Sequence, residues 1–367
     1  MILTRYLMAN IRSLPALFAL VGLVLPSLAD ANGGIYTVTS TAGSGGACTA
    51  NSTADPACTL AAAIAAASDH DVVLFAAEIQ GQTILGSYSI AKSLTIDASP
   101  NGVVLDAQSS GRLFFIDESI YPVSMTVNLS HLTLQHGASP TNGGAFYLGA
   151  HTSLNLDRCT VAHNTAVGDG GGIYNTGYLW IKDSTFYDNA AQHGGAIYNP
   201  TLTGSVVLVN STIAANNASI EGGGIYSASA VVLRSDIVAG NSAPSAPDLA
   251  NVALPSYVLT SYGNNLIGDG TGTNFAESIP SDKVGTGEAP IDAMFSTDGL
   301  TTANGGATPT IALQSASPAR TSGACSSNNG PPHIDPSEFD QRDVPRSTPC
   351  TIGAFDMTGV FYGGFDE

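Results

Sequence analysis

The stretch Gly194-Gly195-Ala196-Ile197-Tyr198 decides the fold, because the middle of the chain contains it four times with small changes. Each copy has small residues first, then a large apolar residue, then a tyrosine. The starts of the copies are 27, 24 and 28 residues apart, and the copies are residues 143–147, 170–174, 194–198 and 222–226. A regular period of this length is typical of stacked repeats, in which each unit packs on the next.

A second phrase lies between these copies and ends in asparagine each time. It occupies residues 159–164, 184–189, 211–216 and 236–241. Apolar residues recur ten, eight and three positions before its last residue. The first two of these positions are two residues apart, and this spacing is typical of a strand with one buried face. Each repeat between residues 128 and 241 therefore predicts three short strands and their corners, which is one coil of a parallel β-helix with coils about 4.8 Å apart.

The corners of the predicted coil have their own residue types. Paired glycines indicate a corner that needs positive φ or a close approach of one chain to another. Asparagines in one column predict a ladder of side-chain hydrogen bonds along the axis, formed by Asn164, Asn189, Asn216 and Asn241.

The N-terminal region predicts export and a cap. Arg5 and Arg12 flank a basic segment before an apolar run at 14–25, which is typical of a secretory signal peptide covering residues 1–29. A retained N-terminal anchor is the alternative, although the run is short for a membrane span. Residues 30–70 predict a strand and a short helix over 58–68, placed to cover the open end of the solenoid.

The remaining regions are assigned by their strand patterns. Residues 71–275 predict the β-helix, and residues 276–367 predict further C-terminal coils and a cap. Four cysteines group as Cys48 with Cys58 and Cys325 with Cys350, and an exported protein can keep such disulfides. Cys159 stands in a column otherwise filled by serine and aspartate, which favours a buried or lining thiol over a nucleophile.

Charge and motifs exclude several function classes. The formal charge is -18, and removing the two leader arginines makes it -20. Such a chain repels nucleic acid and anionic polysaccharide. The glycine phrases lack a Lys-Ser/Thr partner and precede strands, so they do not form a phosphate-binding loop. The sequence has no paired Cys-x-x-Cys zinc spacing and no nucleophile elbow.

The repeat resembles that of bacterial polymorphic outer-membrane-type proteins, through its Gly-Gly-Ala/Gly-Ile-Tyr and Ser-Thr-Phe-x-x-Asn phrases. The resemblance implies an all-β fold, a single-stranded right-handed parallel β-helix of the pectin-lyase-like kind, and a surface location. Residues 58–64 resemble the Cys-Ser-Leu-Arg-Glu-Ala module found before such helices, with Ala61 and Ala62 replacing its charged pair.

The C-terminal region resembles the one called choice-of-anchor Q. The matching segments are residues 263–268, 304–310, 317–319, 340–342 and 352–356, together with Arg346. Asp343 and Thr351 depart from the usual Gly and Asp. In relatives a cell-surface anchor follows. Residues 357–367 contain no membrane span or sorting signal, so a released extracellular protein is expected, with no transmembrane segment in the mature chain.

One column of polar residues is the first candidate for chemistry. It precedes the glycine pairs and contains Asn142, Asp169, His193 and Glu221. In the predicted register the histidine has a carboxylate about 5 Å away on each side. Such a trio could hold a divalent metal, with calcium as the candidate cofactor, or supply an acid and a base. The alternative is that exposed corners accept any polar residue.

Tyrosines form the second candidate. If the isoleucines before them face the core, then Tyr147, Tyr174, Tyr198 and Tyr226 form an outward ladder. Aromatic rows can stack on sugar rings, or they can simply cover neighbouring coils.

Basic residues of the coil body are few. The register places Asp157 beside Lys182 and Arg158 beside Asp183, which predicts ordinary surface pairing. Arg112 and Arg234 are then the unpaired basic candidates for catalysis.

Two functions remain. The first is a secreted or surface-associated, non-catalytic β-helix acting in adhesion or matrix association, with a glycan or a cell-surface component as partner. The second is a carbohydrate-active enzyme, a polysaccharide lyase or glycoside hydrolase, which rests on fold analogy alone. The first is favoured, because the chain is acidic and poor in the basic residues that lyases of acidic glycans use.

Overall fold

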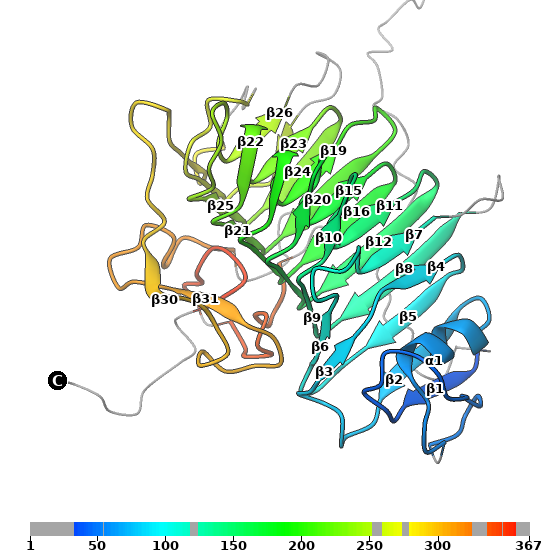
Figure 1. Cartoon of the computed structure of the whole chain (residues 1–367). Helices are drawn as coiled ribbons and strands as arrows, with labels where there is room; N and C mark the ends of the chain where they lie inside the picture. The colour runs from blue at the N-terminus through cyan, green and yellow to red at the C-terminus, as the bar shows by residue number, and fades with distance from the viewer. Residues whose placement is uncertain are drawn as a thin grey trace, which may run out of the picture.

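The computed structural model describes residues 33–53, 55–117, 124–251, 259–273, 279–324, 336–346 and 348–356. Within them the chain winds into coils whose strands stack as parallel sheets along one axis (Figure 1). The predicted parallel β-helix is therefore confirmed. The predicted signal peptide and the C-terminal residues 357–367 lie outside the described residues.

Three long sheets form the walls of the helix, and their strands pair in parallel with the predicted register. Sheet A contains β1 (Ile35–Val38), β2 (Asp71–Phe75), β5 (Leu94–Asp97), β8 (Met125–Ser130), β12 (Thr152–Asp157), β16 (Tyr178–Lys182), β20 (Ser205–Val209), β24 (Ala230–Arg234) and β27 (Leu259–Ser261). Sheet B contains β3 (Thr83–Leu85), β6 (Val103–Asp106), β9 (Leu132–Gln135), β13 (Thr160–Ala162), β17 (Thr185–Tyr187), β21 (Thr212–Ala214), β25 (Ile237–Ala239), β28 (Leu266–Ile267) and β29 (Lys283–Val284). Sheet C contains β4 (Tyr88–Ile90), β7 (Phe114–Ile116), β11 (Phe146–Leu148), β15 (Ile173–Asn175), β19 (Ile197–Asn199), β23 (Ile225–Ser227) and β26 (Leu249–Asn251).

A fourth sheet was not predicted. Sheet D contains β10 (Ala138–Ser139), β14 (Thr165–Ala166), β18 (Ala190–His193) and β22 (Asn217–Glu221). Its strands are short and mostly polar or small, so they have no alternation of apolar residues that would identify them. The prediction of three strands per coil is therefore incomplete, because each of the central coils has four.

The core consists of the inward columns of sheets A, B and C. Leu179, Phe186 and Ile197 represent the three walls of one coil, and each side chain is at most 1% exposed. Burying a side chain of this size contributes about 1.5–3 kcal/mol. Because the same columns repeat in every coil, one hydrophobic cluster extends from β1 to β28.

The glycine corners confirm the predicted backbone requirement. The first glycine of each pair has positive φ, between 58° and 69° at Gly143, Gly170, Gly194 and Gly222. The second glycine has another reason to be glycine. A Cβ atom on Gly195 would lie 2.3 Å from the carbonyl oxygen of Gly223 on the next coil. No side chain fits at that distance.

The predicted asparagine ladder is present and fully buried at Asn164, Asn189 and Asn216. Each side-chain Nδ2 donates to Oδ1 of the asparagine on the next coil, at 2.8–2.9 Å. Asn241 continues the ladder by donating to Oδ1 of Asp248 at 2.9 Å. The ladder satisfies polar groups that the corner would otherwise bury without partners.

The N-terminal helix is shorter than predicted. Helix α1 (Leu60–Ala66) begins after Thr59, whose side chain accepts from the backbone N–H of Ala62 at 3.2 Å. Its buried Leu60 and Ile64 join the main core cluster. Helix α1 lies beside β1 and β2, at the N-terminal end of the β-helix, where sheet A starts (Figure 1). The predicted Cys48–Cys58 disulfide is formed. Cys350 is also disulfide-bonded, and its predicted partner Cys325 lies outside the described residues.

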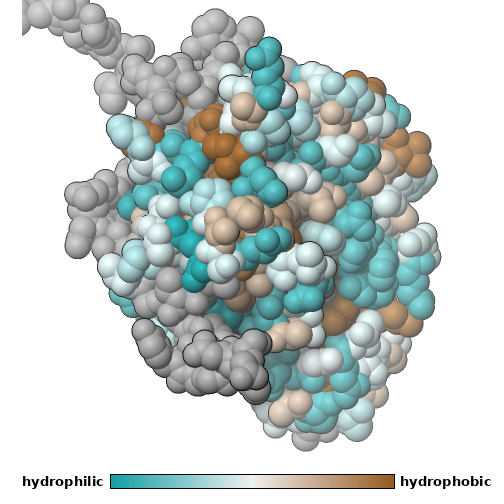
Figure 2. Space-filling model, turned by 90° about the vertical axis from the view of Figure 1, so that its left-hand side faces the viewer, coloured by the Kyte–Doolittle hydropathy of each residue, from teal (hydrophilic) through white to brown (hydrophobic). Residues whose placement is uncertain are grey.

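The C-terminal region differs from the expected stack of coils. After β29, strands β30 (Phe295–Thr301) and β31 (Thr310–Leu313) pair antiparallel and lie beside the β-helix (Figure 1). Residues 336–346 and 348–356, here called the strap, pack on the outer face of sheet B. Figure 2 shows this flank, where hydrophilic residues surround separate apolar patches.

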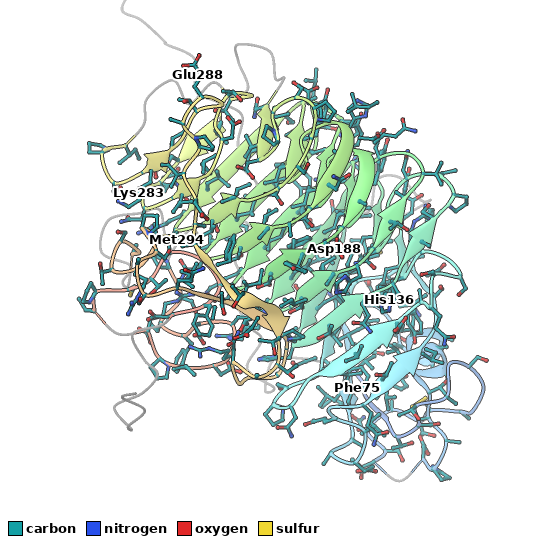
Figure 3. The ribbon with its side chains drawn as sticks, turned by 60° about the vertical axis from the view of Figure 1, so that its left-hand side comes forward. Phe75, His136, Asp188, Lys283, Glu288 and Met294 are labelled. Carbon is teal, nitrogen blue, oxygen red and sulfur yellow. A yellow bond between two sulfur atoms is a disulfide. The ribbon has the colours of Figure 1, made fainter. Side chains whose placement is uncertain are left out.

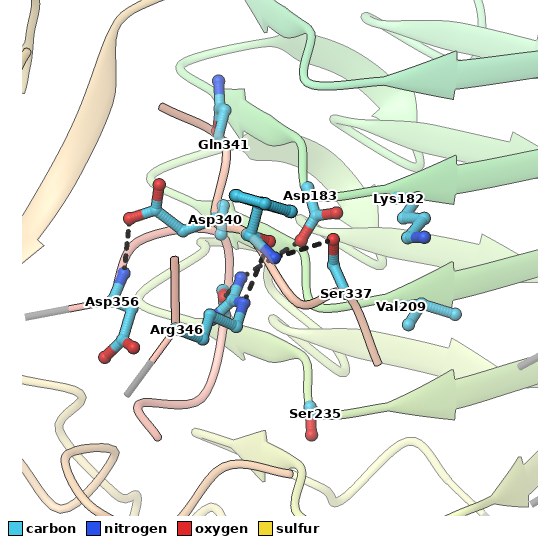
Figure 4. Close-up of polar contacts among 12 residues, drawn as sticks. Lys182, Asp183, Val209, Ser235, Ser337, Asp340, Gln341, Arg346 and Asp356 are labelled. Carbon is cyan, nitrogen blue, oxygen red and sulfur yellow. Dashed lines mark hydrogen bonds and ion pairs between the residues drawn. The ribbon is translucent and has the colours of Figure 1, made fainter. Parts of the chain in front are cut away.

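The strap is fixed by buried polar contacts (Figure 4). Arg346 contacts Asp183 with an Nη2–Oδ1 distance of 3.1 Å, and the two side chains are 1% and 0% exposed. The side chain of Gln341 donates to Oγ1 of Thr160 at 2.8 Å and accepts from Oγ1 of Thr185 at 2.6 Å. The outward residues Thr160 and Thr185 of sheet B are therefore polar, as on an exposed face, but the strap buries them.

The predicted surface pairing of Arg158 with Asp183 is wrong for this reason. Asp157 does lie opposite Lys182 in the register. Arg158, however, contacts Asp157 at 2.7 Å and Asp343 of the strap at 2.8 Å. The strap supplies different partners for both predicted members of the pair.

A histidine also joins the strap to the β-helix. His131 lies between Asp97 and Asp343, with ring nitrogen to carboxylate distances of 3.1 Å on both sides. Burial alone would lower the pKa of His131, but hydrogen bonds to Asp343 and Asp97 outweigh burial and raise the pKa to about 9. A group whose folded pKa is raised contributes stability that is complete below its unfolded pKa and is lost as pH rises through the folded value.

The free energy of unfolding should therefore fall by about 3 kcal/mol as pH rises from 6.5 to 10. Replacing His131 with glutamine should lower stability at pH 6 and flatten this part of the profile. Urea denaturation at a series of pH values measures it. His70, whose side chain is 79% exposed, provides the control, because His70→Gln should leave the profile of the wild type unchanged. A variant profile as steep as the wild-type one would contradict the assignment.

Candidate functional site

The outward residues of sheet C form a stack of aromatic rings. Phe146 and Leu148 face the core, so Tyr147 between them faces outward, and the same holds in the neighbouring strands. Ring centroids lie 5.1, 5.3, 5.6 and 4.9 Å apart along the stack. This aromatic ladder consists of Phe115, Tyr147, Tyr174, Tyr198 and Tyr226. Sequence reasoning missed Phe115, because its coil lacks the Gly-Gly phrase.

Stacking determines what the ladder can contact. Each inner ring has its two faces against neighbouring rings, so its exposed part is the ring edge and the hydroxyl group. Burial raises the pKa of Tyr198 to about 12, and burial also raises the pKa of Tyr174 and Tyr226. These three phenols are therefore neutral at physiological pH and act as hydrogen-bond donors and acceptors.

The predicted polar column lies beside the ladder. Nδ1 of His193 is 2.8 Å from Oδ1 of Asp169, and both side chains are about one quarter exposed (27% and 22%). Glu221 is the register partner of His193 on the next coil, after a shift in register at which β22 has one residue more than β18. The His193 ring is 5.9 Å from the ring of Tyr198 and 5.5 Å from that of Tyr226. We call the ladder together with Asp169, His193 and Glu221 the ridge.

The ridge does not assemble ligands for a single cation. Asp169 and Glu221 are two coils apart, about 10 Å at the strand spacing, and calcium takes six to eight oxygens at less than 2.6 Å. Among the residues that the structure describes, no three His, Cys, Asp or Glu side chains gather into a possible metal site. Calcium as a cofactor of this protein stays a prediction, and the binding experiment below tests it.

Arg112 is not a free basic residue, which corrects the prediction. Its guanidinium donates to the carbonyl oxygens of Asn142 and Gly143 at 2.6 and 2.9 Å. It also lies 5.6 and 5.3 Å from the ring centroids of Phe115 and Tyr147. Arg112 thus satisfies carbonyls at the first glycine corner. Arg234, the other candidate, is buried and engaged as well.

Cys159 is a buried free thiol, as predicted. It is 0% exposed, and burial raises its pKa to about 12. Its Sγ lies 3.4 Å from the carbonyl oxygens of Leu129 and Asp157. A thiol with this pKa supplies almost no thiolate at neutral pH, so it is unsuited to nucleophilic catalysis.

A second group of titratable side chains was not predicted. Nδ1 of His136 is 2.9 Å from Asp106, and Nδ1 of His163 is 2.8 Å from Asp188. The two imidazole rings stack with centroids 5.8 Å apart. Figure 3 labels His136 and Asp188 on the flank of the helix. The two histidines are 27 residues apart in sequence, and only the coil register brings them together.

Comparisons with known proteins agree with the repeat. Residues 183–200 match the family described as the Chlamydia polymorphic membrane protein repeat. No curated protein matches the chain. The crystal structure of the pectate lyase Pel9A is similar to it with a TM-score of 0.40 and 13% identity, over 88% of this chain and 96% of that chain. The resemblances of residues 58–64 and of the C-terminal region stay predictions.

The matched repeat includes His193 and Tyr198 of the ridge. The chain is a parallel β-helix, and its residues 183–200 match a repeat of the polymorphic membrane protein type. No helix in the described part of the chain is long and apolar enough to cross a membrane.

Proposed function

We propose that this protein is a secreted or surface-associated β-helix that binds neutral carbohydrate along the ridge, in adhesion or matrix association, without cleaving it. The observation that carries the proposal is the ladder of five stacked rings beside a carboxylate and imidazole column. The matched repeat supports a surface setting, because its family is described as a membrane protein family.

The ridge suits a hydroxyl-rich polymer. Tyr174, Tyr198 and Tyr226 present edges and neutral hydroxyls at intervals of 5.6 and 4.9 Å between ring centroids. Asp169 accepts hydrogen bonds, and the His193 imidazole can donate or accept at Nε2. A linear glycan lying along the axis would meet these groups in succession, and contacts to sugars would be hydrogen bonds to ring edges rather than face stacking.

The charge of the ridge selects the kind of glycan. Asp169 raises the pKa of Tyr174 and Tyr198, and Glu221 raises that of Tyr226, in each case after the larger effect of burial. Asp169 and Glu221 therefore place negative charge beside Tyr174, Tyr198 and Tyr226, and the whole chain has a formal charge of -18, while Arg112 lies against Phe115 and Tyr147 at the other end of the ladder. An acidic polysaccharide would be repelled, so the proposed ligand is uncharged.

A glycan array with the full chain, read with and without calcium, tests the proposal. Binding to neutral oligosaccharides without released product is expected. Binding that requires calcium would support the predicted metal, although not at one shared ion on the ridge. Release of unsaturated or shortened oligosaccharide would contradict a non-catalytic role, and binding restricted to acidic glycans would contradict the electrostatic argument.

A pair of variants locates the binding surface. Tyr174→Ala should weaken binding of the best array ligand about tenfold, or about 1.4 kcal/mol, because it removes the central ring of the ladder. Tyr178→Ala is the control, because Tyr178 is 52% exposed but belongs to sheet A. Isothermal titration calorimetry measures both affinities, and circular dichroism checks that both variants are folded. Equal losses in the two variants would exclude the ridge as the binding surface.

The alternative is a carbohydrate-active enzyme, and one observation favours it. Asp169 holds Nδ1 of His193 at 2.8 Å, which orients the imidazole and leaves Nε2 available as a base. If the array reveals turnover, His193→Ala should abolish it. His163→Ala should retain it, because His163 forms a similar pair with Asp188 away from the ridge.

A further inference from the structure

The closest contact in the aromatic ladder joins two tyrosines of adjacent coils. The rings of Tyr198 and Tyr226 have centroids 4.9 Å apart and an interplanar angle of 26°. The two residues are direct partners in the parallel pairing of β19 and β23. The backbone register therefore keeps the two side chains next to each other on adjacent coils.

The geometry points to an oxidative cross-linking site at this pair. We infer that a one-electron oxidant, such as a haem peroxidase with hydrogen peroxide, converts Tyr198 and Tyr226 into a dityrosine bridge between adjacent coils. Each phenol loses one electron and its hydroxyl proton and becomes a phenoxyl radical. The radicals join through their ortho carbons, and the two ortho hydrogens then move to the phenol oxygens. Two tyrosines and one hydrogen peroxide give one dityrosine and two waters.

A proton acceptor stands next to the pair. An oxidised phenol must transfer its proton to a base, and both tyrosines hold theirs firmly, because burial raises the pKa of Tyr198 to about 12 and also raises that of Tyr226. The His193 ring lies 5.5 Å from the Tyr226 ring and 5.9 Å from the Tyr198 ring. The carboxylate of Asp169 lies 2.8 Å from Nδ1 of His193 and accepts a hydrogen bond from it, which leaves Nε2 as the ring nitrogen that can accept a proton.

The ladder also limits where the radical can couple. Phe115 at one end has no phenol, so coupling is confined to the four tyrosines. Among their three contacts, Tyr147 with Tyr174 and Tyr174 with Tyr198 have longer centroid distances of 5.3 and 5.6 Å. Both Tyr198 and Tyr226 have ring contacts with His193. The Tyr198–Tyr226 bridge should therefore be the main product.

The bridge would alter the stability of the solenoid. It closes a loop of one coil, since the residues are 28 positions apart in sequence. A covalent link between residues that are already neighbours restricts the unfolded chain more than the folded one. The cross-linked protein should consequently unfold at a higher temperature than the untreated protein, without a change in circular dichroism.

The test treats the full chain with a haem peroxidase and limiting hydrogen peroxide. Dityrosine fluorescence, gel migration and peptide mapping should reveal a monomer that has lost two hydrogen atoms and joins the Tyr198 peptide to the Tyr226 peptide. Tyr226→Phe should lose most of this product. The ladder already accepts phenylalanine at position 115, so this variant should fold. Tyr178→Phe should retain the product.

The role of His193 as proton acceptor has its own readout. His193→Gln should slow dityrosine formation several-fold, while its circular dichroism stays that of the wild type. An unchanged yield in Tyr226→Phe, or cross-links found only between molecules, would overturn the assignment of the site. A wild-type rate of dityrosine formation in His193→Gln would overturn the part played by the histidine.

Discussion

Replacing Gly195 with alanine is expected to destabilise the protein by about 3 kcal/mol, the upper range for overpacking. The added Cβ would lie 2.3 Å from the carbonyl oxygen of Gly223 and 2.5 Å from that of Asn217. Both atoms belong to the backbone of the next coil, so neither can turn away as a flexible side chain would. Urea denaturation, followed by the fluorescence of the single tryptophan Trp180, measures the change.

Gly111→Ala is the matched control. Its Cβ would meet only the side-chain oxygen of Ser87, at 3.5 Å, which is an ordinary contact. This variant should unfold within about 0.5 kcal/mol of the wild type. If the two variants unfold at the same urea concentration, close packing of the coils at the second glycine does not explain the repeated Gly-Gly phrase.

Replacing Arg346 with glutamine is expected to cost about 3 kcal/mol at pH 8, because it leaves the carboxylate of Asp183 buried without its cation. Asp183 is 0% exposed, and its Oδ1 is 3.1 Å from Nη2 of Arg346. The same arginine also donates to the carbonyl oxygen of Gly353 at 2.9 Å, within the strap. Urea denaturation of the variant and the wild type, each at pH 5 and pH 8, measures the cost.

The pH dependence distinguishes the charge effect from a loss of packing. Burial raises the pKa of Asp183 to about 6, and Arg346 opposes that increase. A carboxyl group with a raised folded pKa contributes stability below its unfolded pKa and loses it as pH rises through the folded value. Without Arg346 the pKa of Asp183 in the folded protein is higher, so the loss of stability continues to higher pH. The deficit of Arg346→Gln should therefore be larger at pH 8 than at pH 5.

A second variant completes this comparison. In Asp183→Asn, the buried group carries no charge, so adding Arg346→Gln should cost less than it costs in the wild type. Equal costs in the two backgrounds, or a deficit that does not change with pH, would show that Arg346 stabilises the strap without its ion pair.

The coils could be predicted because their signals are local. Gly195 needs to be glycine for a reason that recurs at each coil, and Asn189 bonds to its counterpart one period away. Columns of such residues are visible in the sequence once the period is found. The outward position of Tyr198 follows from the buried position of Ile197 by the alternation of a strand.

The strap could not be predicted, because its contacts join residues far apart in sequence. Gln341 accepts a hydrogen bond from Thr185, which is 156 positions away in sequence. In the sequence alone, Thr185 looks like an outward, exposed residue of a strand. Asp183 likewise looks like a surface residue next to Lys182. Its burial depends on Arg346, and no periodic signal connects the two positions.

The candidate site was predicted in part. The column containing Asp169 and His193 was expected at one corner, and the structure joins these two side chains directly. The contact of His193 with the tyrosines was not expected, because it depends on how the corner turns between sheets D and C. The position of Arg112 was also missed, since its side chain extends to the next coil.

Hydroxyl-radical footprinting of the full chain, with and without the best glycan from the array, tests the proposed role of the ridge most directly. The measurement reports the oxidation of individual side chains by mass spectrometry. Bound glycan should protect Tyr174, Tyr198 and Tyr226 and leave Tyr178 on sheet A unprotected. Protection of Tyr178 or of His136 and His163, with the ridge tyrosines oxidised as in the free protein, would contradict carbohydrate binding at the ridge.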